Sequence, residues 1–191
     1  MNKKELTAVF EIILIIIAFI VLSWLIQTNL DFFEKYIGSS VYGMFVYFII
    51  TIIAIVIAPV SMLPLITIAT NLWGIIPTVI LNVTGWTIGS LIAFLLARKY
   101  GVPIVKRLIS LDKIYAIEKK IPQENLFWSV VFFRMVIPAD ILSYALGLFS
   151  KMKTSHYTLA TLIGVTPFAF VFAYLGIFPW YYQSFAFLVA A

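Results

Sequence analysis

The stretch FFRMVIPADILSYALG, residues 132–147, decides the fold because it places charged residues inside apolar sequence. Arg134 and Asp140 lie on either side of Pro138, and most of their neighbours are aliphatic or aromatic. Side chains meet on one straight helix when they are three or four residues apart, which these two are not. A break at Pro138, which removes a backbone donor, would let both charged side chains face one cavity. We therefore predict a broken helix over residues 126–150.

The composition around this stretch is that of a membrane protein. The 191 residues are 63% hydrophobic and 11% charged, whereas a soluble domain has about 25% charged residues. Residues 36–97 contain no charged side chain, and a membrane-crossing helix needs only about 20 apolar residues. The sequence therefore predicts an all-α integral membrane protein with a single membrane domain over residues 1–191.

The few ionisable residues narrow the classes of function. The formal charge is +5, but the basic residues lie beside apolar segments, where they orient a membrane protein and meet anionic headgroups. The chain has no cysteine and one histidine, and it lacks the HExxH, G-x-S-x-G and P-loop patterns. We expect no enzyme activity, no cofactor, no metal site and no nucleic-acid partner.

The apolar segments predict about four transmembrane helices and two broken segments. The N-terminal segment is interpreted as a retained helix because its apolar core is long and no cleavage site follows it. The predicted elements are a helix over 7–27, a broken segment over 41–74, a helix over 75–98, an amphipathic interfacial helix over 103–121, a second broken segment over 126–150, a helix over 154–177 and a short segment over 178–191.

Both broken segments are predicted to be re-entrant hairpins. Pro59 and Pro64 interrupt the first, and irregular backbone at membrane depth must be shielded by protein or face water. A complete crossing over 41–58 is the alternative. It would place the basic residues of 98–120 outside, against the positive-inside rule, so we prefer the hairpin. Both termini are then cytoplasmic, and we take a bacterial plasma membrane as the default location.

This layout forms an inverted repeat, because a hairpin and a crossing helix occur twice and enter from opposite sides. Pro64 precedes Gly74 in the first half, as Pro138 precedes Gly147 in the second. Many secondary transporters have inverted repeats with broken helices, and their substrate site lies at the repeat interface.

Arg134 is the leading candidate for substrate binding. An arginine at the bilayer centre costs about 2.5–3.5 kcal/mol, and its planar donors suit phosphate or carboxylate. Asp140 would orient Arg134 or carry a proton. The alternative is structural, with Arg134 snorkelling to the interface or forming a salt bridge with Asp140. Asn71 and Asn82 either line the first hairpin's cavity or form helix–helix hydrogen bonds.

The helix over 75–98 carries structural features. Gly85 and Gly89 are four residues apart, so they lie on one helix face and allow another backbone to approach closely. Arg98 ends the predicted crossing, and we interpret it as an orientation anchor.

Two motifs resemble one known family. GWTIGSLIAFLLARKYG, residues 85–101, resembles the G-x-x-x-G-x-x-x-[AF]-x-x-x-x-R-x-x-G signature of the DedA superfamily, also called the VTT-domain or SNARE-associated Golgi protein family. Residues 132–168 resemble its second signature, an F-x-R and a proline followed by a Y-A-x-G-like end and a helix with G-x-x-P. The resemblance covers about residues 41–177 and implies two opposed re-entrant hairpins and movement of lipids across the bilayer.

The resemblance assigns individual residues. Arg134, Pro138, Tyr144 and Gly147 match the second signature, while Gly85, Gly89, Arg98 and Gly101 match the first. Bacterial DedA-type members carry an acidic residue in the first hairpin and a second arginine after the proline. This chain has neither, and Asp140 is the nearby charge. It therefore resembles the Golgi-protein-like branch more closely.

The first functional hypothesis is a transporter or scramblase for a phosphate-bearing lipid. Its partners would be anionic or phosphate-bearing membrane lipids, with proton or sodium coupling and an oligomer both left open. The second hypothesis is a small-solute or ion secondary transporter on the same architecture. The third is a non-transporting membrane scaffold.

Overall fold

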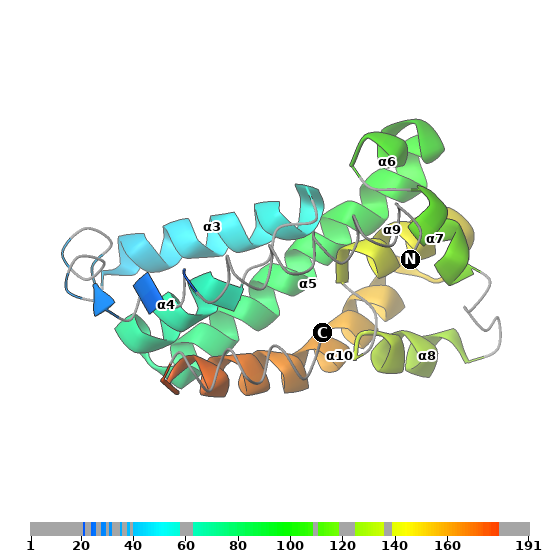
Figure 1. The fold of residues 1–191 in the computed structure, drawn as a ribbon. Coiled ribbons are helices and arrows are strands. Elements are labelled where there is room, and N and C mark those ends of the chain that lie inside the picture. Colours follow the sequence, from blue (N-terminus) through cyan, green and yellow to red (C-terminus); the bar gives the residue numbers. More distant parts are fainter. Residues whose placement is uncertain are drawn as a thin grey trace, which may run out of the picture.

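The computed structural model describes residues 40–57, 63–108, 111–118, 125–135 and 139–179, together with isolated residues between 21 and 38. Its regular elements in these ranges are α-helices (Figure 1). The predicted helix over 7–27 and the segment over 178–191 lie almost entirely outside the described residues. Pro59 and Pro138 also lie outside them, although the helix ends on both sides of each are described.

The first half consists of two short helices and one long helix. These are α3 (Val41–Ile57), α4 (Leu63–Trp73) and α5 (Ile75–Tyr100). The interval between α3 and α4 contains Pro59, and Pro64 is in the first turn of α4, where a missing backbone N–H is tolerated. Gly74 alone joins α4 to α5, with a φ of 83° that glycine adopts without steric cost.

Two short helices follow where one amphipathic helix was predicted. They are α6 (Val102–Leu108) and α7 (Leu111–Glu118). Lys106 and Arg107 are exposed, whereas Val105 and Ile114 are completely buried in the main apolar core. The apolar side of this segment therefore packs against the protein itself, and its basic side faces outward.

The second half repeats the order of the first. It consists of α8 (Leu126–Phe133), α9 (Ala139–Phe149) and α10 (Thr154–Gly176). Residues 132–147 do not form one continuous helix, because α8 ends before Arg134 and α9 begins directly after Pro138.

The two halves are interlocked through their long helices. The central helix α5 packs against α3, α9 and α10, and α10 also packs against α4 and α8 (Figure 1). The second short helix of each half thus packs against the long helix of the other half. In Figure 1, α5 runs in the opposite direction to α10, and α3 in the opposite direction to α8.

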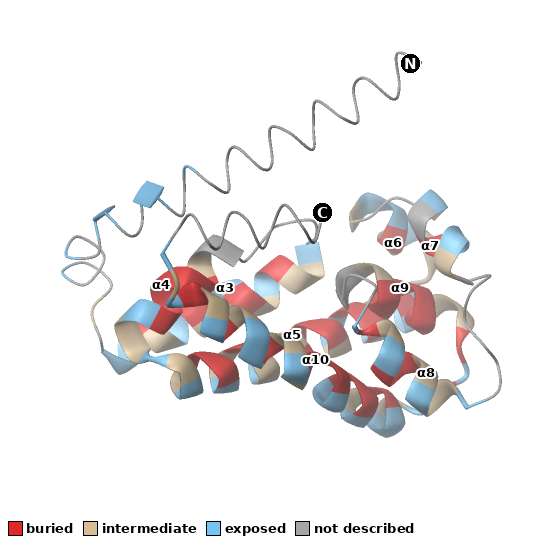
Figure 2. Cartoon of the chain, turned by 60° about the horizontal axis from the view of Figure 1, so that its bottom comes forward, coloured by how far each residue is buried: buried red, intermediate tan, exposed pale blue. Residues whose placement is uncertain are grey.

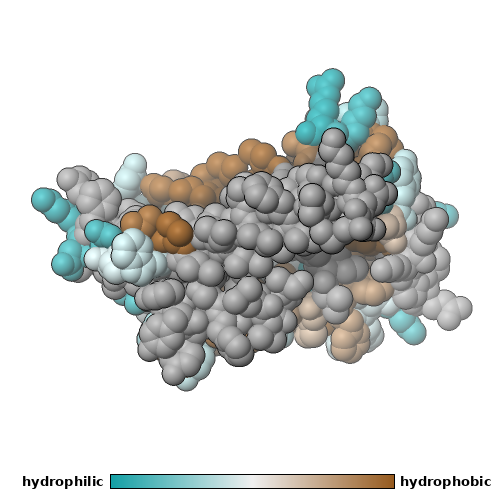
Figure 3. All heavy atoms as spheres, viewed as in Figure 1, coloured by the Kyte–Doolittle hydropathy of each residue, from teal (hydrophilic) through white to brown (hydrophobic). Residues whose placement is uncertain are grey.

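The surface and interior have the polarity expected of a protein in lipid. Helices α5 and α10 are long and apolar enough to cross a membrane, while α3 is shorter. Large apolar side chains are exposed along α3, and charged side chains gather over α6 (Figure 3). Buried residues run along α5, α9 and α10 (Figure 2). Several of these buried residues are polar, and they locate the candidate site.

Glycines set the separation of the packed helices. A Cβ atom at Gly85 would lie 2.9 Å from the Thr51 side chain, and one at Gly89 would lie 3.0 Å from the Ile52 carbonyl oxygen. A Cβ atom at Gly147 would lie 2.5 Å from the Phe94 carbonyl oxygen. Helices α3 and α9 therefore lie directly against the backbone of α5, which holds the two halves together.

Candidate functional site

Arg134 lies inside the protein, just beyond the end of α8, with only 6% of its surface exposed. Its Nη2 atom lies 3.1 Å from Ser143 Oγ on α9. The same nitrogen lies 2.6 Å from Tyr157 Oη and 3.1 Å from Thr161 Oγ1, both on α10. Hydroxyl groups from two helices thus accept hydrogen bonds from one guanidinium, and they hold its direction.

Local backbone structure explains how this arginine reaches the interior. The Arg134 N–H donates to the Val130 carbonyl oxygen at 3.0 Å, so the residue continues the last turn of α8. Its side chain lies across α10 at Gly164, where a Cβ atom would come within 2.8 Å of Arg134 Cβ. The same atom would lie 2.9 Å from the Val131 carbonyl oxygen. Gly164 therefore creates the space in which the end of α8 meets α10.

Tyr157 connects this site to the central helix. Its ring is completely buried and stacks on Phe94 of α5, with ring centroids 4.0 Å apart and an interplanar angle of 11°. Its hydroxyl donates to the Ser90 carbonyl oxygen of α5 at 3.1 Å while it accepts from Arg134. The Arg134 guanidinium carbon also lies 5.5 Å from the centre of this ring. A movement of the guanidinium would therefore alter the contacts that Tyr157 makes with α5.

The cluster places an ionisable side chain in the buried interior. An ionised group removed from water is costly unless it is paired and hydrogen-bonded, so the surrounding hydroxyls stabilise a charge that apolar packing would exclude. A guanidinium offers five N–H donors in a planar fork that matches phosphate or carboxylate oxygens. The arrangement presents hydrogen-bond donors of the kind that an anionic group accepts from. Asp140 is in the first turn of α9, and its side chain is outside the described part.

Sequence reasoning missed three residues of this cluster, namely Ser143, Tyr157 and Thr161. One signal was available, because Tyr157 and Thr161 are four residues apart on an apolar helix and therefore share a face. Their relation to Arg134 depends on the packing of α8 against α10, which no local pattern in the sequence specifies.

Tyr144 and the two asparagines occupy other positions. Tyr144 is buried, and its hydroxyl donates to the Val56 carbonyl oxygen near the end of α3, so it joins the two broken segments. Asn71 Nδ2 donates to the Thr67 carbonyl oxygen at 2.8 Å and to that of Gly176 at 3.0 Å, which links α4 to the end of α10. Asn82 is completely buried, and its Oδ1 accepts from Tyr47 Oη of α3 at 2.6 Å. Both asparagines thus form helix–helix hydrogen bonds.

Arg98 has a definite structural contact in addition to its place at the end of α5. Its two terminal nitrogens donate to the carbonyl oxygens of Ser150 and Met152, each at 2.7 Å. Its guanidinium carbon lies 4.2 Å from the centre of the Phe94 ring. Arg98 therefore fixes the connection between α9 and α10 to the end of α5.

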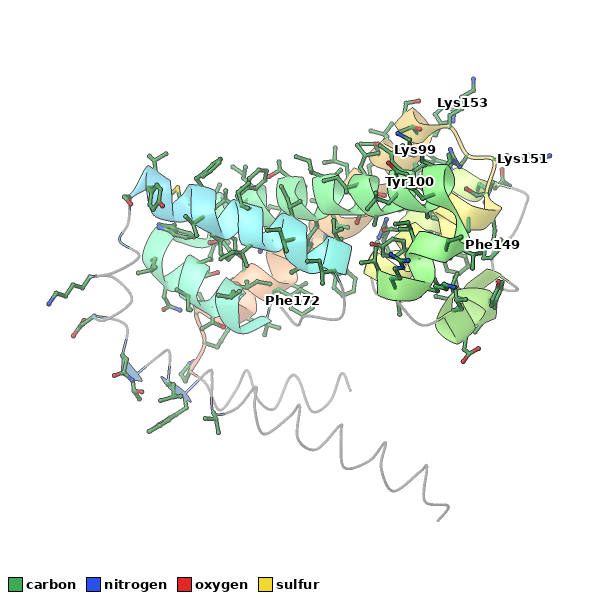
Figure 4. All side chains as sticks on the ribbon, turned by 90° about the horizontal axis from the view of Figure 1, so that it is seen from above. Lys99, Tyr100, Phe149, Lys151, Lys153 and Phe172 are labelled. Carbon is green, nitrogen blue, oxygen red and sulfur yellow. The ribbon has the colours of Figure 1, made fainter. Side chains whose placement is uncertain are left out.

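The basic residues at this end of the molecule gather around Arg98. Figure 4 shows Lys99, Lys151 and Lys153 there, and α6 with Lys106 and Arg107 follows directly after α5. The basic residues of 98–107 and those of 151–153 are distant in sequence. The positive-inside argument requires both groups to lie on one side of the membrane. Among the described residues, no group of three histidine, cysteine, aspartate or glutamate side chains could hold a metal ion.

Comparison with known proteins gives one match. The VTT domain family matches the chain over residues 59–178, which includes both halves from the interval before α4 to the end of α10. No curated protein and no solved structure matches the chain.

Proposed function

Because the chain belongs to the VTT-domain family, a membrane-associated family that includes DedA, we propose that it moves a phosphate-bearing lipid across the bilayer, as a transporter or scramblase. The observation that carries the proposal is the buried guanidinium of Arg134, held in place by hydroxyl groups of α9 and α10. A lipid headgroup crossing the membrane needs such a group, because its phosphate loses water that only charge and hydrogen bonds can replace.

The interrupted segments supply the second part of the mechanism. In our proposal, the α3–α4 and α8–α9 segments enter the membrane from opposite sides as re-entrant hairpins. Tyr144 of α9 joins the two segments through the Val56 carbonyl oxygen, near the end of α3. Arg134 lies at the end of α8, beside the α8–α9 interruption, and in our proposal a headgroup from either leaflet reaches its guanidinium.

The proposed family branch, location and ion coupling are inferred from the sequence. The absence of charge over residues 36–97 supports the Golgi-protein-like branch and disfavours an acidic proton carrier in the first half. We place the protein in a bacterial plasma membrane with both termini cytoplasmic. Its lipids are anionic or phosphate-bearing, it acts without a cofactor and catalyses no covalent reaction, and proton or sodium coupling is decided by measuring flux with and without an ion gradient.

The direct test is lipid translocation in vesicles that contain the purified protein and a headgroup-labelled fluorescent phospholipid. Dithionite bleaches label in the outer leaflet, so transbilayer movement appears as bleaching beyond that of protein-free vesicles. We expect excess bleaching with the wild type and its loss with Arg134→Gln. Arg107→Gln, which alters an exposed arginine of α6, is the matched control and should keep the wild-type rate.

Each remaining hypothesis predicts a different result. Bleaching equal to that of empty vesicles, combined with solute uptake driven by an ion gradient, would favour the small-solute transporter. Absence of both activities, with a cellular phenotype that depends on residues 178–191 and not on Arg134, would favour the scaffold.

A further inference from the structure

A second group of buried polar atoms lies on α5, in the first half of the protein. Asn82 and Thr78 are both completely buried on α5, and their four-residue spacing places them on one helix face. Tyr47 of α3 occupies only the Asn82 Oδ1 atom. Asn82 Nδ2 and Thr78 Oγ1 have no hydrogen-bond partner in the part of the chain that the structure describes.

The position of these residues corresponds to that of the Arg134 cluster. Counted from the first residue of α5, Ile75, the residues Thr78, Asn82 and Gly85 are fourth, eighth and eleventh. Counted from the first residue of α10, Thr154, the fourth, eighth and eleventh are Tyr157, Thr161 and Gly164.

The corresponding residues make corresponding contacts. Gly85 faces the first short helix of its half at Thr51, as Gly164 faces the end of α8 at Arg134. The fourth and eighth residues of α10 hold the guanidinium. The fourth and eighth residues of α5 face an interior to which residues 36–97 supply no charged group. The repeat therefore builds the same polar position twice and places an arginine in one of them.

The chemistry of the unfilled position defines what it would bind. A buried N–H or hydroxyl group without a partner loses its hydrogen bonds to water, and the membrane interior offers no replacement. The amide supplies N–H donors and the threonine supplies a hydroxyl, while residues 36–97 supply no cation that would compensate an anion. An uncharged oxygen that accepts hydrogen bonds satisfies both groups without bringing in a charge.

We propose that Asn82 and Thr78 form a second, uncharged subsite that binds a hydrogen-bond-accepting oxygen, supplied by a lipid acyl-ester carbonyl or by water. Ser90, whose carbonyl oxygen accepts from Tyr157 in the Arg134 cluster, is eight positions after Asn82 on α5. That interval corresponds to about 12 Å along a helix. The proposal that a lipid supplies this oxygen rests on the proposed function, whereas the existence of the subsite does not.

The first measurement asks whether the subsite is occupied in the purified protein. Thr78→Val keeps the shape of the side chain and removes the hydroxyl. If an oxygen is bound there, the variant loses that contact and its melting temperature falls. If the hydroxyl is unoccupied, removing it relieves an unsatisfied group and the melting temperature rises by about 2 °C or more. Thr87→Val is the matched control, since its hydroxyl bonds to the Val83 carbonyl oxygen of the same helix.

The second measurement identifies the source of the oxygen. Dihexanoyl phosphatidic acid and its dihexyl ether analogue share a phosphate headgroup, but only the first has ester carbonyls. A larger thermal stabilisation by the ester that disappears in Thr78→Val indicates a lipid carbonyl. Equal stabilisation by both probes, with a lower melting temperature of Thr78→Val, indicates water.

The proposal is overturned if Thr78→Val raises the melting temperature and leaves the ester-to-ether difference as it is in the wild type. Asn82→Leu should repeat the effect of Thr78→Val on the ester preference, with Tyr47→Phe as its control because that change removes the Oδ1 contact and leaves Asn82 Nδ2 in place. None of these readouts requires transport. A protein that shows the subsite but fails the translocation assay would contradict the proposed function alone, and the reverse result would contradict the subsite alone.

Discussion

The hydroxyl of Tyr157 accepts a hydrogen bond from Arg134 at 2.6 Å and, at the same time, donates one to the backbone of α5. The charged group of the second half is thereby connected to the helix that forms the centre of the first half. Such a contact makes the guanidinium part of the interface between the halves. It also means that a headgroup drawing Arg134 away from Tyr157 would weaken that interface, which provides a route from binding to movement.

Tyr157→Phe tests this connection. The variant keeps the stack on Phe94 and removes only the hydroxyl, so we expect a loss of about 1–3 kcal/mol in the free energy of unfolding, since two buried groups lose a partner. We also expect slower lipid movement. Thermal melting and the vesicle assay measure the two effects. Tyr174→Phe, which alters an exposed tyrosine of the same helix, is the control. A fully active Tyr157→Phe protein would show that the hydroxyl only supports the fold.

Gly164→Ala tests the close approach of α8 and α10. The added methyl group would meet Arg134 Cβ and the Val131 carbonyl oxygen, so the end of α8 must shift. Overpacking of this kind costs about 1–3 kcal/mol, and it displaces the guanidinium as well. We expect a lower melting temperature together with reduced transport. Leu159→Ala, on an exposed position of α10, controls for general effects on this helix. Wild-type stability of Gly164→Ala would contradict the contact.

Arg98→Gln tests whether Arg98 is a structural residue, in contrast to Arg134. The variant loses the hydrogen bonds to the Ser150 and Met152 carbonyl oxygens, and we expect destabilisation of about 1 kcal/mol because the residue is exposed. Transport per folded molecule should be unchanged, which contrasts with Arg134→Gln. Hydrogen exchange of the α9–α10 connection reports the local loosening. Abolished transport in a stably folded Arg98→Gln protein would assign Arg98 to the lipid pathway.

The local chemistry of the chain is sufficient to predict some of these features. A proline between two charges in apolar sequence indicates an interruption, and the separate helices α8 and α9 are found there. The same stretch makes Arg134 the leading candidate for a buried cation, with snorkelling to the interface as the alternative, and in the structure Arg134 is buried. The hydroxyl partners could not be predicted, since serine, threonine and tyrosine are common in membrane helices and only packing selects these three.

Other features that the sequence did not predict depend on contacts between residues that are distant in sequence. Apolar residues at helical spacing over 103–121 predict an amphipathic helix, but the pattern does not say whether lipid or protein covers the apolar side. Val105 and Ile114 are covered by the protein. In the same way, a buried asparagine predicts a hydrogen bond without naming the partner. Asn71 finds a backbone carbonyl oxygen and Asn82 finds a tyrosine, each on another helix.

The central claim is that the Arg134 guanidinium contacts the phosphate of a lipid inside the protein. Solid-state NMR tests it most directly, through dephasing of ¹⁵N-labelled arginine side-chain signals by lipid ³¹P in reconstituted membranes. The chain has three arginines, Arg98, Arg107 and Arg134, so Arg134→Lys identifies the relevant signal by difference. We predict a dephased guanidinium signal that disappears in Arg134→Lys. Dephasing that is confined to Arg98 and Arg107, and that survives the substitution unchanged, would contradict the account.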